Sequence, residues 1–197
     1  MESIFSVTTG FYLTGGTCLN RFYLERRYSD DLDLFTSDNN LFREDSRLLR
    51  ETLSKAVVGF DTVVDTRDFI RLMVDGVLKV DLVNDRVYRV GKSAQMGTIL
   101  VDNISNIGAN KICAVLGRDD PKDIFDLYTI FSLPEVSWPD IMAAAARKCV
   151  FDREELRFRL KSFPMPMIGM LPLADPVFAE EFQRDYPTML SCLLAAV

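Results

Sequence analysis

Two aspartates separated by one apolar residue, Asp31 and Asp33, are the side chains of this 197-residue chain best suited to chemistry. They fall in a run of alternating character, residues 29–36, which predicts a β-strand. Side chains two residues apart share one face of a strand and lie roughly 6.5–7 Å apart, so both carboxylates can converge on a cation. Without a cation the pair would repel, and magnesium prefers oxygen ligands of this kind. The pair therefore indicates a metal site, with an ordinary exposed strand as the alternative.

A third carboxylate, Asp81, lies in another strand-like run, residues 77–83, in which Lys79 and Asp81 point away from the core. If this strand lies beside residues 29–36, Asp81 joins the first two carboxylates. Three carboxylates can hold two magnesium ions about 3.5–4 Å apart, which stabilise the attacking and leaving oxygens of an in-line displacement. The alternative is a solvent-facing aspartate that pairs with Lys79 or with a neighbouring arginine.

A glycine pair, Gly15-Gly16, follows the short apolar run Phe11–Thr14, which predicts a strand that enters a tight turn. Glycine lacks a Cβ, so a triphosphate can approach the backbone N–H groups. The following helix, with Thr17 as the expected cap, would present its positive end to the same anion. Glycine pairs are common in plain turns, so the evidence lies in the order: two glycines, a helix, an Asp-x-Asp strand, and a later aspartate.

The composition removes several kinds of mechanism. The chain has no histidine, which excludes Ser-His-Asp and Cys-His catalysis and histidine-ligated zinc. Acid–base and metal chemistry must therefore use carboxylates, lysines or hydroxyls. The net charge of -6 argues against a surface that coats nucleic acid generally, but a local basic patch could still bind it.

The cysteines and the hydropathy pattern bear on location. Four scattered cysteines contain no C-x-x-C pair and are expected to be reduced, namely Cys18, Cys113, Cys149 and Cys192. The first residues lack a basic n-region and a cleavage site, and no apolar run reaches the roughly 18 residues that cross a bilayer. We therefore expect a cytoplasmic protein.

The elements around these motifs predict an α/β front half, residues 1–102, that carries catalysis, and a helical back half, residues 103–197, that completes the site. Asp75-Gly76 is a hairpin turn signal between two strands. Strands are expected over residues 60–66, 69–74 and 77–83, and helices over residues 39–58, 104–116, 121–131, 139–149, 153–163 and from about Val177. The first of these helices carries a row of arginines, Arg43, Arg47 and Arg50, which indicates a solvated face or, alternatively, a track for substrate phosphates.

Three motifs in this order resemble those of the nucleotidyltransferase superfamily, with its polymerase-β-like fold, and most closely its AbiEii-type toxin branch. The branch pattern is roughly G-G-T/S-x-L, then an R-x-S-x-D-L-D strand, then a helical segment with Lys, Arg and R-D-x-x-D-L-Y. The chain matches it, over about residues 10–131, with Gly15-Gly16-Thr17-Cys18-Leu19, Arg27-Tyr28-Ser29-Asp30-Asp31-Leu32-Asp33, Lys111 to Arg118, and Lys122-Asp123-Ile124-Phe125-Asp126-Leu127-Tyr128. It departs where Arg26 replaces a frequent histidine and where Lys122 replaces an arginine, which would remove a bidentate contact.

The resemblance implies an α+β fold with a nucleotidyltransferase-type mixed β-sheet flanked by helices and followed by a helical C-terminal half. It implies that Asp31, Asp33 and Asp81 hold Mg²⁺. Gly15, Gly16 and Thr17 would hold the triphosphate of an NTP, with Ser29 beside it. Lys111 would pair with phosphate charge, and Asp123 would orient it or assist the incoming hydroxyl. Asp126 is expected to be a helix-surface or structural polar group.

The function implied by this resemblance is magnesium-dependent transfer of a nucleotide from an NTP to an acceptor, with tRNA as the acceptor and a cognate antitoxin as a protein partner. Such an enzyme would be the toxin of a toxin–antitoxin or phage-defence system. An antibiotic-type nucleotidyltransferase with a small-molecule substrate is the first alternative, since an acidic chain attracts a cationic substrate. The second is a catalytically inactive fold that serves as a binding module.

Overall fold

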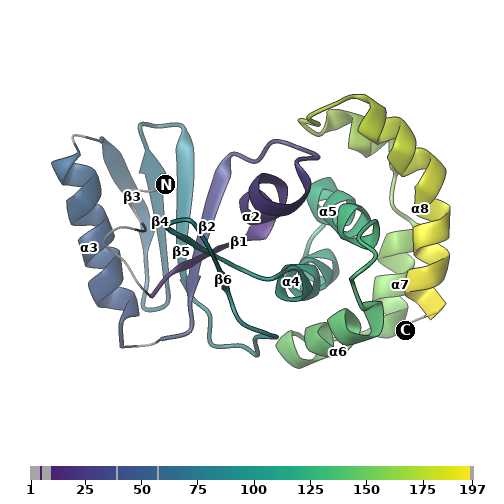
Figure 1. Ribbon diagram of the computed structural model, residues 1–197, viewed down its shortest axis with the longest axis horizontal. Coiled ribbons are helices and arrows are strands. Elements are labelled where there is room, and N and C mark those ends of the chain that lie inside the picture. The colour runs from purple at the N-terminus through teal and green to yellow at the C-terminus, as the bar shows by residue number, and fades with distance from the viewer. Residues whose placement is uncertain (1–4, 6–9, 39, 57, 196–197) are drawn as a thin grey trace. The chain divides into compact units, whose positions relative to one another are not determined.

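The computed structural model describes residues 5, 10–38, 40–56 and 58–195. The chain divides into two compact units. The first unit comprises residues 1–18, 30–86 and 92–102, and the second comprises residues 19–29, 87–91 and 103–197. Figure 1 labels the elements: strands are gathered in the first unit and most helices in the second. Two short segments, residues 19–29 and 87–91, thus belong to the second unit although they precede residue 103.

The first unit is built on a seven-stranded mixed sheet with strand order β3-β4-β5-β2-β1-β7-β6. Strand β2 pairs with β5 in parallel, as β1 does with β7, and the other pairs are antiparallel. The strands are β1 Tyr12–Thr14, β2 Asp31–Thr36, β3 Phe60–Asp65, β4 Phe69–Val74, β5 Leu78–Asn84, β6 Ala94–Met96 and β7 Ile99–Val101. A mixed sheet accompanied by helices confirms the predicted α+β class. Strands β6 and β7 were not predicted.

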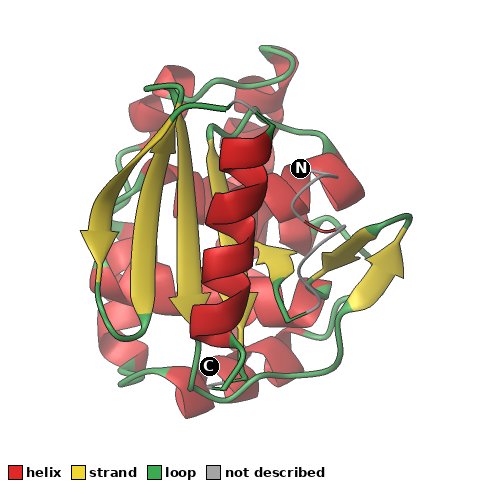
Figure 2. Ribbon diagram, turned by 90° about the vertical axis from the view of Figure 1, so that its left-hand side faces the viewer, coloured by secondary structure: helices red, strands yellow, loops and turns green. Residues whose placement is uncertain are grey.

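One face of the sheet forms the core of this unit. The registers align Leu34 with Leu82 and Leu82 with Ile70, so buried side chains from β2, β5 and β4 lie side by side. Helix α3, Phe42–Lys55, lies across a face of the sheet (Figure 2) and buries Leu49 completely. The helix is shorter than the predicted 39–58, and two positions of that range, 39 and 57, lie outside the described residues.

The arginine row of α3 is neutralised within the first unit. Arg43 and Arg50 both pair with Asp65, at 2.5 and 3.2 Å, and Arg47 pairs with Glu51 at 2.6 Å. These side chains are exposed or half-buried, which agrees with a solvated face.

The second unit packs helices around an aromatic core. The helices are α4 Ile104–Gly117, α5 Pro121–Phe131, α6 Trp138–Lys148, α7 Arg153–Lys161, a 3-10 helix Met165–Met170, and α8 Val177–Ala195. Asn103, Asp120, Ser137 and Asp152 cap α4 to α7 by accepting backbone N–H bonds. The caps explain why α4, α5 and α7 begin at the predicted residue and α6 one residue earlier. At the centre, the ring of Phe182 lies 4.7 Å from that of Tyr186 and 5.0 Å from that of Tyr128. No helix among the described residues is long and apolar enough to cross a membrane.

Helix α2, Gly15–Leu19, continues into a π-helical turn, Asn20–Leu24, that ends at Glu25 with φ +47°. Asn20 Oδ1 accepts hydrogen bonds from the backbone N–H groups of Arg26 and Arg27, at 3.1 and 3.0 Å. The chain then forms a bridge to residues 172–174. Tyr28 N donates to Pro172 O at 2.8 Å, and Ala174 N donates to Arg26 O at 3.0 Å. A segment near the start of the chain is thereby fixed within the second unit.

Candidate active site

The register of the central strands brings the predicted carboxylates together. Strand β5 lies beside β2, as the sequence predicts, with Asp81 opposite Asp33 and Lys79 opposite Asp31. Neighbouring strands are about 4.8 Å apart, so Asp33 and Asp81 are immediate neighbours on one face. Strand β4 continues the row, because Arg71 lies directly opposite Asp81. Asp33, Asp81 and Arg71 therefore form a row of two acidic side chains and one basic side chain across β2, β5 and β4.

Two cations neutralise these carboxylates. Arg71 donates two hydrogen bonds to Asp81, both at 2.8 Å, and Lys79 Nζ lies 2.7 Å from Asp31 Oδ2. The hydrogen bonds to Asp81 raise the pKa of Arg71 above its usual value, and the charges of Asp31 and Asp33 add to the shift. The pairing of Asp81 with an arginine is the alternative that the sequence left open. The sequence did not identify Arg71 as the arginine that pairs with Asp81.

The residues present fit a hard divalent cation in the type of their donor atoms. Asp31, Asp33 and Asp81 offer only oxygen donors, which suit Mg²⁺, and they share one face of the sheet. Among the residues that the structure describes, no three acidic or cysteine side chains converge closely enough to enclose an ion. Arg71 instead holds Asp81, and Lys79 holds Asp31. A metal ion would compete with these cations for the same oxygens.

The glycine turn lies against the same group. Thr14 pairs with Asp33, so Gly15 follows directly beside that carboxylate. Gly15 has φ +71°, and a Cβ there would lie 2.1 Å from Asp33 Oδ2. Only glycine fits both the backbone conformation and the space.

Thr17 does not cap the helix, contrary to the prediction, because α2 already begins at Gly15. Its hydroxyl instead donates to the backbone carbonyl of Asp31. Gly15, Thr17, Asp31 and Asp33 are thus brought together within the first unit, where Gly16 follows in the same turn. The role of Gly15, Gly16 and Thr17 toward a triphosphate stays a prediction.

A second charged group lies inside the helical unit. Lys111 Nζ lies 2.8 Å from Asp123 Oδ1 and 2.6 Å from Asp126 Oδ2. Arg118 makes a bidentate contact with Asp123, at 2.6 and 3.0 Å, and Arg27 makes another with Asp126, at 2.8 and 2.7 Å. We call these five residues the buried network. All of them are buried except Arg118.

Opposite charges dominate the electrostatics of the buried network. Burial disfavours the charged form of Lys111, but the charges of Asp126 and Asp123 outweigh it and raise the pKa of Lys111. Burial likewise opposes ionisation of the two aspartates, yet Lys111 together with Arg118 or Arg27 lowers the pKa of each. The network therefore holds three cations and two anions in their charged forms at neutral pH.

Several expectations change in the second unit. Asp126 is fully buried and is not a helix-surface residue, so the structural alternative holds. Arg118 makes a bidentate contact with Asp123, five residues later in the chain, which the sequence did not predict. Ser29, which the sequence placed at the start of the 29–36 strand, lies two residues before β2 begins, and it belongs to the second unit.

From the sequence, Lys111 and Asp123 were predicted to contact the substrate, and no partner was predicted for Arg27. The structure pairs Lys111 with Asp123, and Arg27 with Asp126. One signal could have revealed this: Asp123 and Asp126 are three residues apart on a helix and so share a face, and a buried acid requires a cation.

Comparisons with known proteins agree with this architecture. Among solved structures, JHP933 from Helicobacter pylori aligns with TM-score 0.64 and 18% identity, over 98% of this chain and 87% of that one. MenT4, a nucleotidyltransferase toxin from Mycobacterium tuberculosis H37Rv, aligns with TM-score 0.61 and 15% identity, over 98% and 90%. The antibiotic-resistance factor ANT(2'')-Ia aligns with TM-score 0.52 and 12% identity, over 70% and 80%.

At these identities the three structures show a shared fold. No curated protein matches the chain. A family model described as "Nucleotidyl transferase AbiEii toxin, Type IV TA system" matches residues 3–196, nearly the whole chain. The chain belongs to the AbiEii family of nucleotidyltransferase toxins of type IV toxin–antitoxin systems.

Proposed function

We propose that the protein transfers a nucleotide from an NTP to an acceptor hydroxyl with the aid of Mg²⁺. The hydroxyl oxygen would bond to the α-phosphorus, the bond between that phosphorus and the oxygen bridging to the β-phosphate would break, and pyrophosphate would leave. One observation carries this proposal: the alignment of Asp33 with Asp81 across β2 and β5, with Gly15 packed against Asp33. Asp31, Asp33 and Asp81 would hold the metal. The bound metal would neutralise the phosphate charge that develops during transfer.

The chain's own residues would position the NTP and the acceptor. Backbone N–H groups of the turn at Gly15, Gly16 and Thr17 would bind the triphosphate, because a glycine backbone permits close approach. An aspartate of the carboxylate group would accept the proton of the incoming hydroxyl, since the chain has no histidine. Lys79 and Arg71 lie beside these carboxylates and would keep the face from becoming strongly negative before substrate binds.

The roles of Ser29, Lys111 and Asp123 form a separate part of the proposal. Lys111 would supply charge to a phosphate, with Asp123 as its orienting partner at 2.8 Å. Lys111 is buried and already paired with two carboxylates, which keeps it protonated. Ser29 would lie beside the triphosphate.

For the acceptor we propose tRNA, and for the partner a cognate antitoxin protein. The support is membership of a toxin family whose description names a toxin–antitoxin system. Action on tRNA would place the protein in the cytoplasm.

The test is transfer of label. The purified protein is incubated with each α-labelled NTP, Mg²⁺ and total tRNA, with EDTA in a parallel reaction. Label in RNA that requires Mg²⁺ and disappears in Asp31→Ala and Asp33→Ala is expected. As a matched control, Asp65→Ala removes an aspartate that pairs with α3 in the same unit and should leave transfer intact.

Three outcomes would contradict parts of the proposal. Transfer that survives Asp31→Ala together with Asp33→Ala would show that these residues do not hold the metal. Label on an aminoglycoside instead of RNA would identify a small-molecule acceptor. No label with either acceptor, and no heat of NTP binding, would indicate a catalytically inactive binding module.

A further inference from the structure

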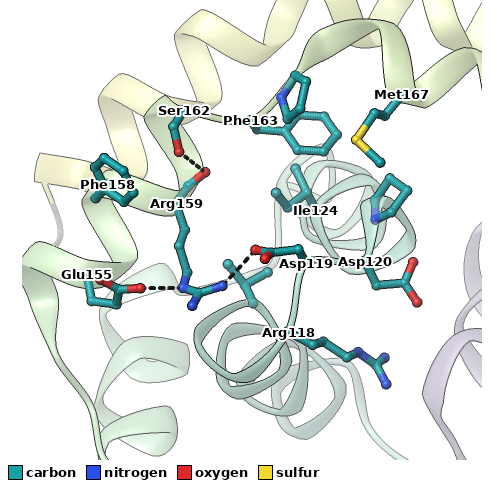
Figure 3. Close-up of a pocket in the computed structure, with 13 residues that line it drawn as sticks. Arg118, Asp119, Asp120, Ile124, Glu155, Phe158, Arg159, Ser162, Phe163 and Met167 are labelled. Carbon is teal, nitrogen blue, oxygen red and sulfur yellow. Dashed lines mark hydrogen bonds and ion pairs between the residues drawn. The ribbon is translucent and has the colours of Figure 1, made fainter.

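A pocket of about 340 Å³ opens within the second unit, between the α4–α5 junction, α7 and the 3-10 helix (Figure 3). Its volume lies at the lower end of the range for small-molecule sites, about 300–1,000 Å³. Every residue that lines it belongs to the second unit. None of the site residues predicted from the sequence lines this pocket.

Apolar side chains form the walls of the pocket. Among the side chains that line the pocket, Ile124 and Val115 are buried, while Phe163 and Met167 are half-buried. Phe158 is 66% exposed, an unusual state for a large apolar ring, and it lies at the rim. Such walls suit the two faces of a flat ring, which gains dispersion energy and loses water on both sides.

The rim is polar and nearly balanced in charge. Arg159 is held between Glu155 and Asp119, at 2.5 and 2.7 Å, as the dashed lines in Figure 3 show. Asp120 and Arg118 complete the polar edge. Three carboxylates and two guanidinium groups do not favour a polyanion, whose phosphates need excess positive charge. They do suit a ring whose edge carries both hydrogen-bond donors and acceptors.

One residue links the pocket to the buried network. Arg118 lines the pocket and also binds Asp123, which in turn binds Lys111. Arg118 thereby connects the pocket with residues for which a phosphate role is proposed. A flat ring with a mixed polar edge is the chemistry of a nucleobase, and both substrates of the proposed function, the NTP and the RNA, carry such rings.

We propose that this pocket binds a nucleobase, either the base of the donor NTP or an unpaired base of the acceptor RNA. The identity of the ligand rests on the proposed nucleotidyl transfer. The ring would stack against Phe158 and Phe163, with Ile124 and Met167 below it. Its polar edge would meet Asp119, Asp120 and Arg118.

The test measures binding without turnover. Each of the four NTPs, inorganic triphosphate, and a single-stranded RNA with an unpaired 3′ end is titrated separately into the full chain by calorimetry. Phe158→Ala removes an exposed ring, and Met167→Ala removes part of the wall. Met170→Ala is the matched control, because Met170 lies on the same 3-10 helix, is 79% exposed and does not line the pocket.

Loss of one base contact is expected to weaken binding about tenfold. If the NTP supplies the base, both pocket variants weaken NTP binding and leave inorganic triphosphate and RNA unchanged. If the acceptor supplies it, they weaken RNA binding and leave NTP unchanged. In both cases Met170→Ala binds like the wild type.

The proposal is overturned if the pocket variants bind all probes like the wild type, or if Met170→Ala weakens binding equally. It is also overturned if the pocket variants bind NTP and inorganic triphosphate equally more weakly, or if the wild type binds neither NTP nor RNA. Wild-type label transfer separates the two proposals. Transfer with unchanged binding in the pocket variants refutes the pocket alone, whereas pocket-dependent binding without transfer refutes the proposed function alone.

Discussion

At the scale of single residues, the feature that most affects the candidate metal site is Arg71. It lies opposite Asp81 on the neighbouring strand and holds both oxygens of that carboxylate, at 2.8 Å each. Lys79 does the same for one oxygen of Asp31. Cations therefore already hold two of the three carboxylates, Asp31 and Asp81. A divalent ion must therefore share or displace ligands that are already occupied.

Arg71→Gln is predicted to bind Mg²⁺ or Mn²⁺ several-fold more tightly than the wild type, because the site loses a positive charge and Asp81 loses a competing partner. Without metal, the same change should lower the free energy of unfolding by about 1–3 kcal/mol, because Asp81 is buried and loses its charged hydrogen-bond partner. Calorimetric metal titration and urea unfolding measure the two effects.

The control for this prediction is Arg43→Gln, which breaks the exposed pair with Asp65 in the same unit. It should leave metal affinity unchanged. Weaker metal binding by Arg71→Gln would show instead that Arg71 positions Asp81 as a ligand.

At the scale of elements, the sequence predicted strands and helices well where the signal is local. Alternation identified β2 and β5, and Pro121 and Pro139 marked the starts of α5 and α6 to within one residue. The three-residue strands β6 and β7 were not predicted, because so short a run shows no periodicity and its strand conformation depends on pairing with neighbouring strands. Thr17 was assigned as a cap because its partner, the Asp31 carbonyl, is set by tertiary packing.

The candidate site was predictable only in part, for the same reason. The neighbourhood of Asp33 and Asp81 needs a parallel pairing of distant strands, and here the family resemblance supplied what periodicity lacks. The contact between Arg71 and Asp81 was within reach, since the Asp75-Gly76 turn fixes the register of β4 and β5. The buried network was indicated only in part, because the spacing of Asp123 and Asp126 on α5 calls for a cation but nothing local identifies Lys111 and Arg27 as the cations.

The turn at Gly15 gives a prediction at this scale. In Gly15→Ala the new Cβ would lie 2.1 Å from Asp33 Oδ2, so Asp33 must move, and the backbone must also bear φ +71°. We expect a loss of about 1–3 kcal/mol in stability and a loss of nucleotidyl transfer of at least tenfold. Thermal unfolding and label transfer measure these effects.

Gly76→Ala separates strain from displacement. Gly76 has φ +69° with no atom within 4 Å of its ideal Cβ, so this variant bears the backbone strain alone. It should lose about 1 kcal/mol in stability and keep its activity. Equal losses of activity in both variants would contradict the role given to Asp33.

At the scale of the whole molecule, the ionisable groups determine how stability depends on pH. The folded state lowers the pKa of Asp123 and Asp126, so each contributes stability above its unfolded pKa of about 3.9, and this stability is lost as pH falls through the lower folded pKa. Lys111 and Arg27 have raised pKa values and lose their contribution only at strongly alkaline pH. No histidine titrates near neutrality.

The free energy of unfolding is therefore predicted to be nearly constant between pH 6 and 8 and to fall steadily below about pH 4, because the unfolded chain then binds more protons than the folded one. Urea unfolding followed by circular dichroism across this range measures it. Asp126→Asn should cost about 3–5 kcal/mol at pH 7, as expected for a broken buried pair, and should weaken the acid dependence. Asp185→Asn, at an exposed pair with Arg184, should change the stability at pH 7 and its acid dependence little, and an equal effect would contradict the assignment.

The bridge between residues 26–28 and residues 172–174 has a consequence for the timing of synthesis. Ribosomes add on the order of 5–20 residues per second, so residues 172–174 are synthesised on the order of ten seconds after residues 26–28. During that interval Arg27 is already outside or near the exit tunnel while its anchoring segment does not yet exist. The second unit of the nascent toxin thus stays incomplete until residues 172–174 have been translated.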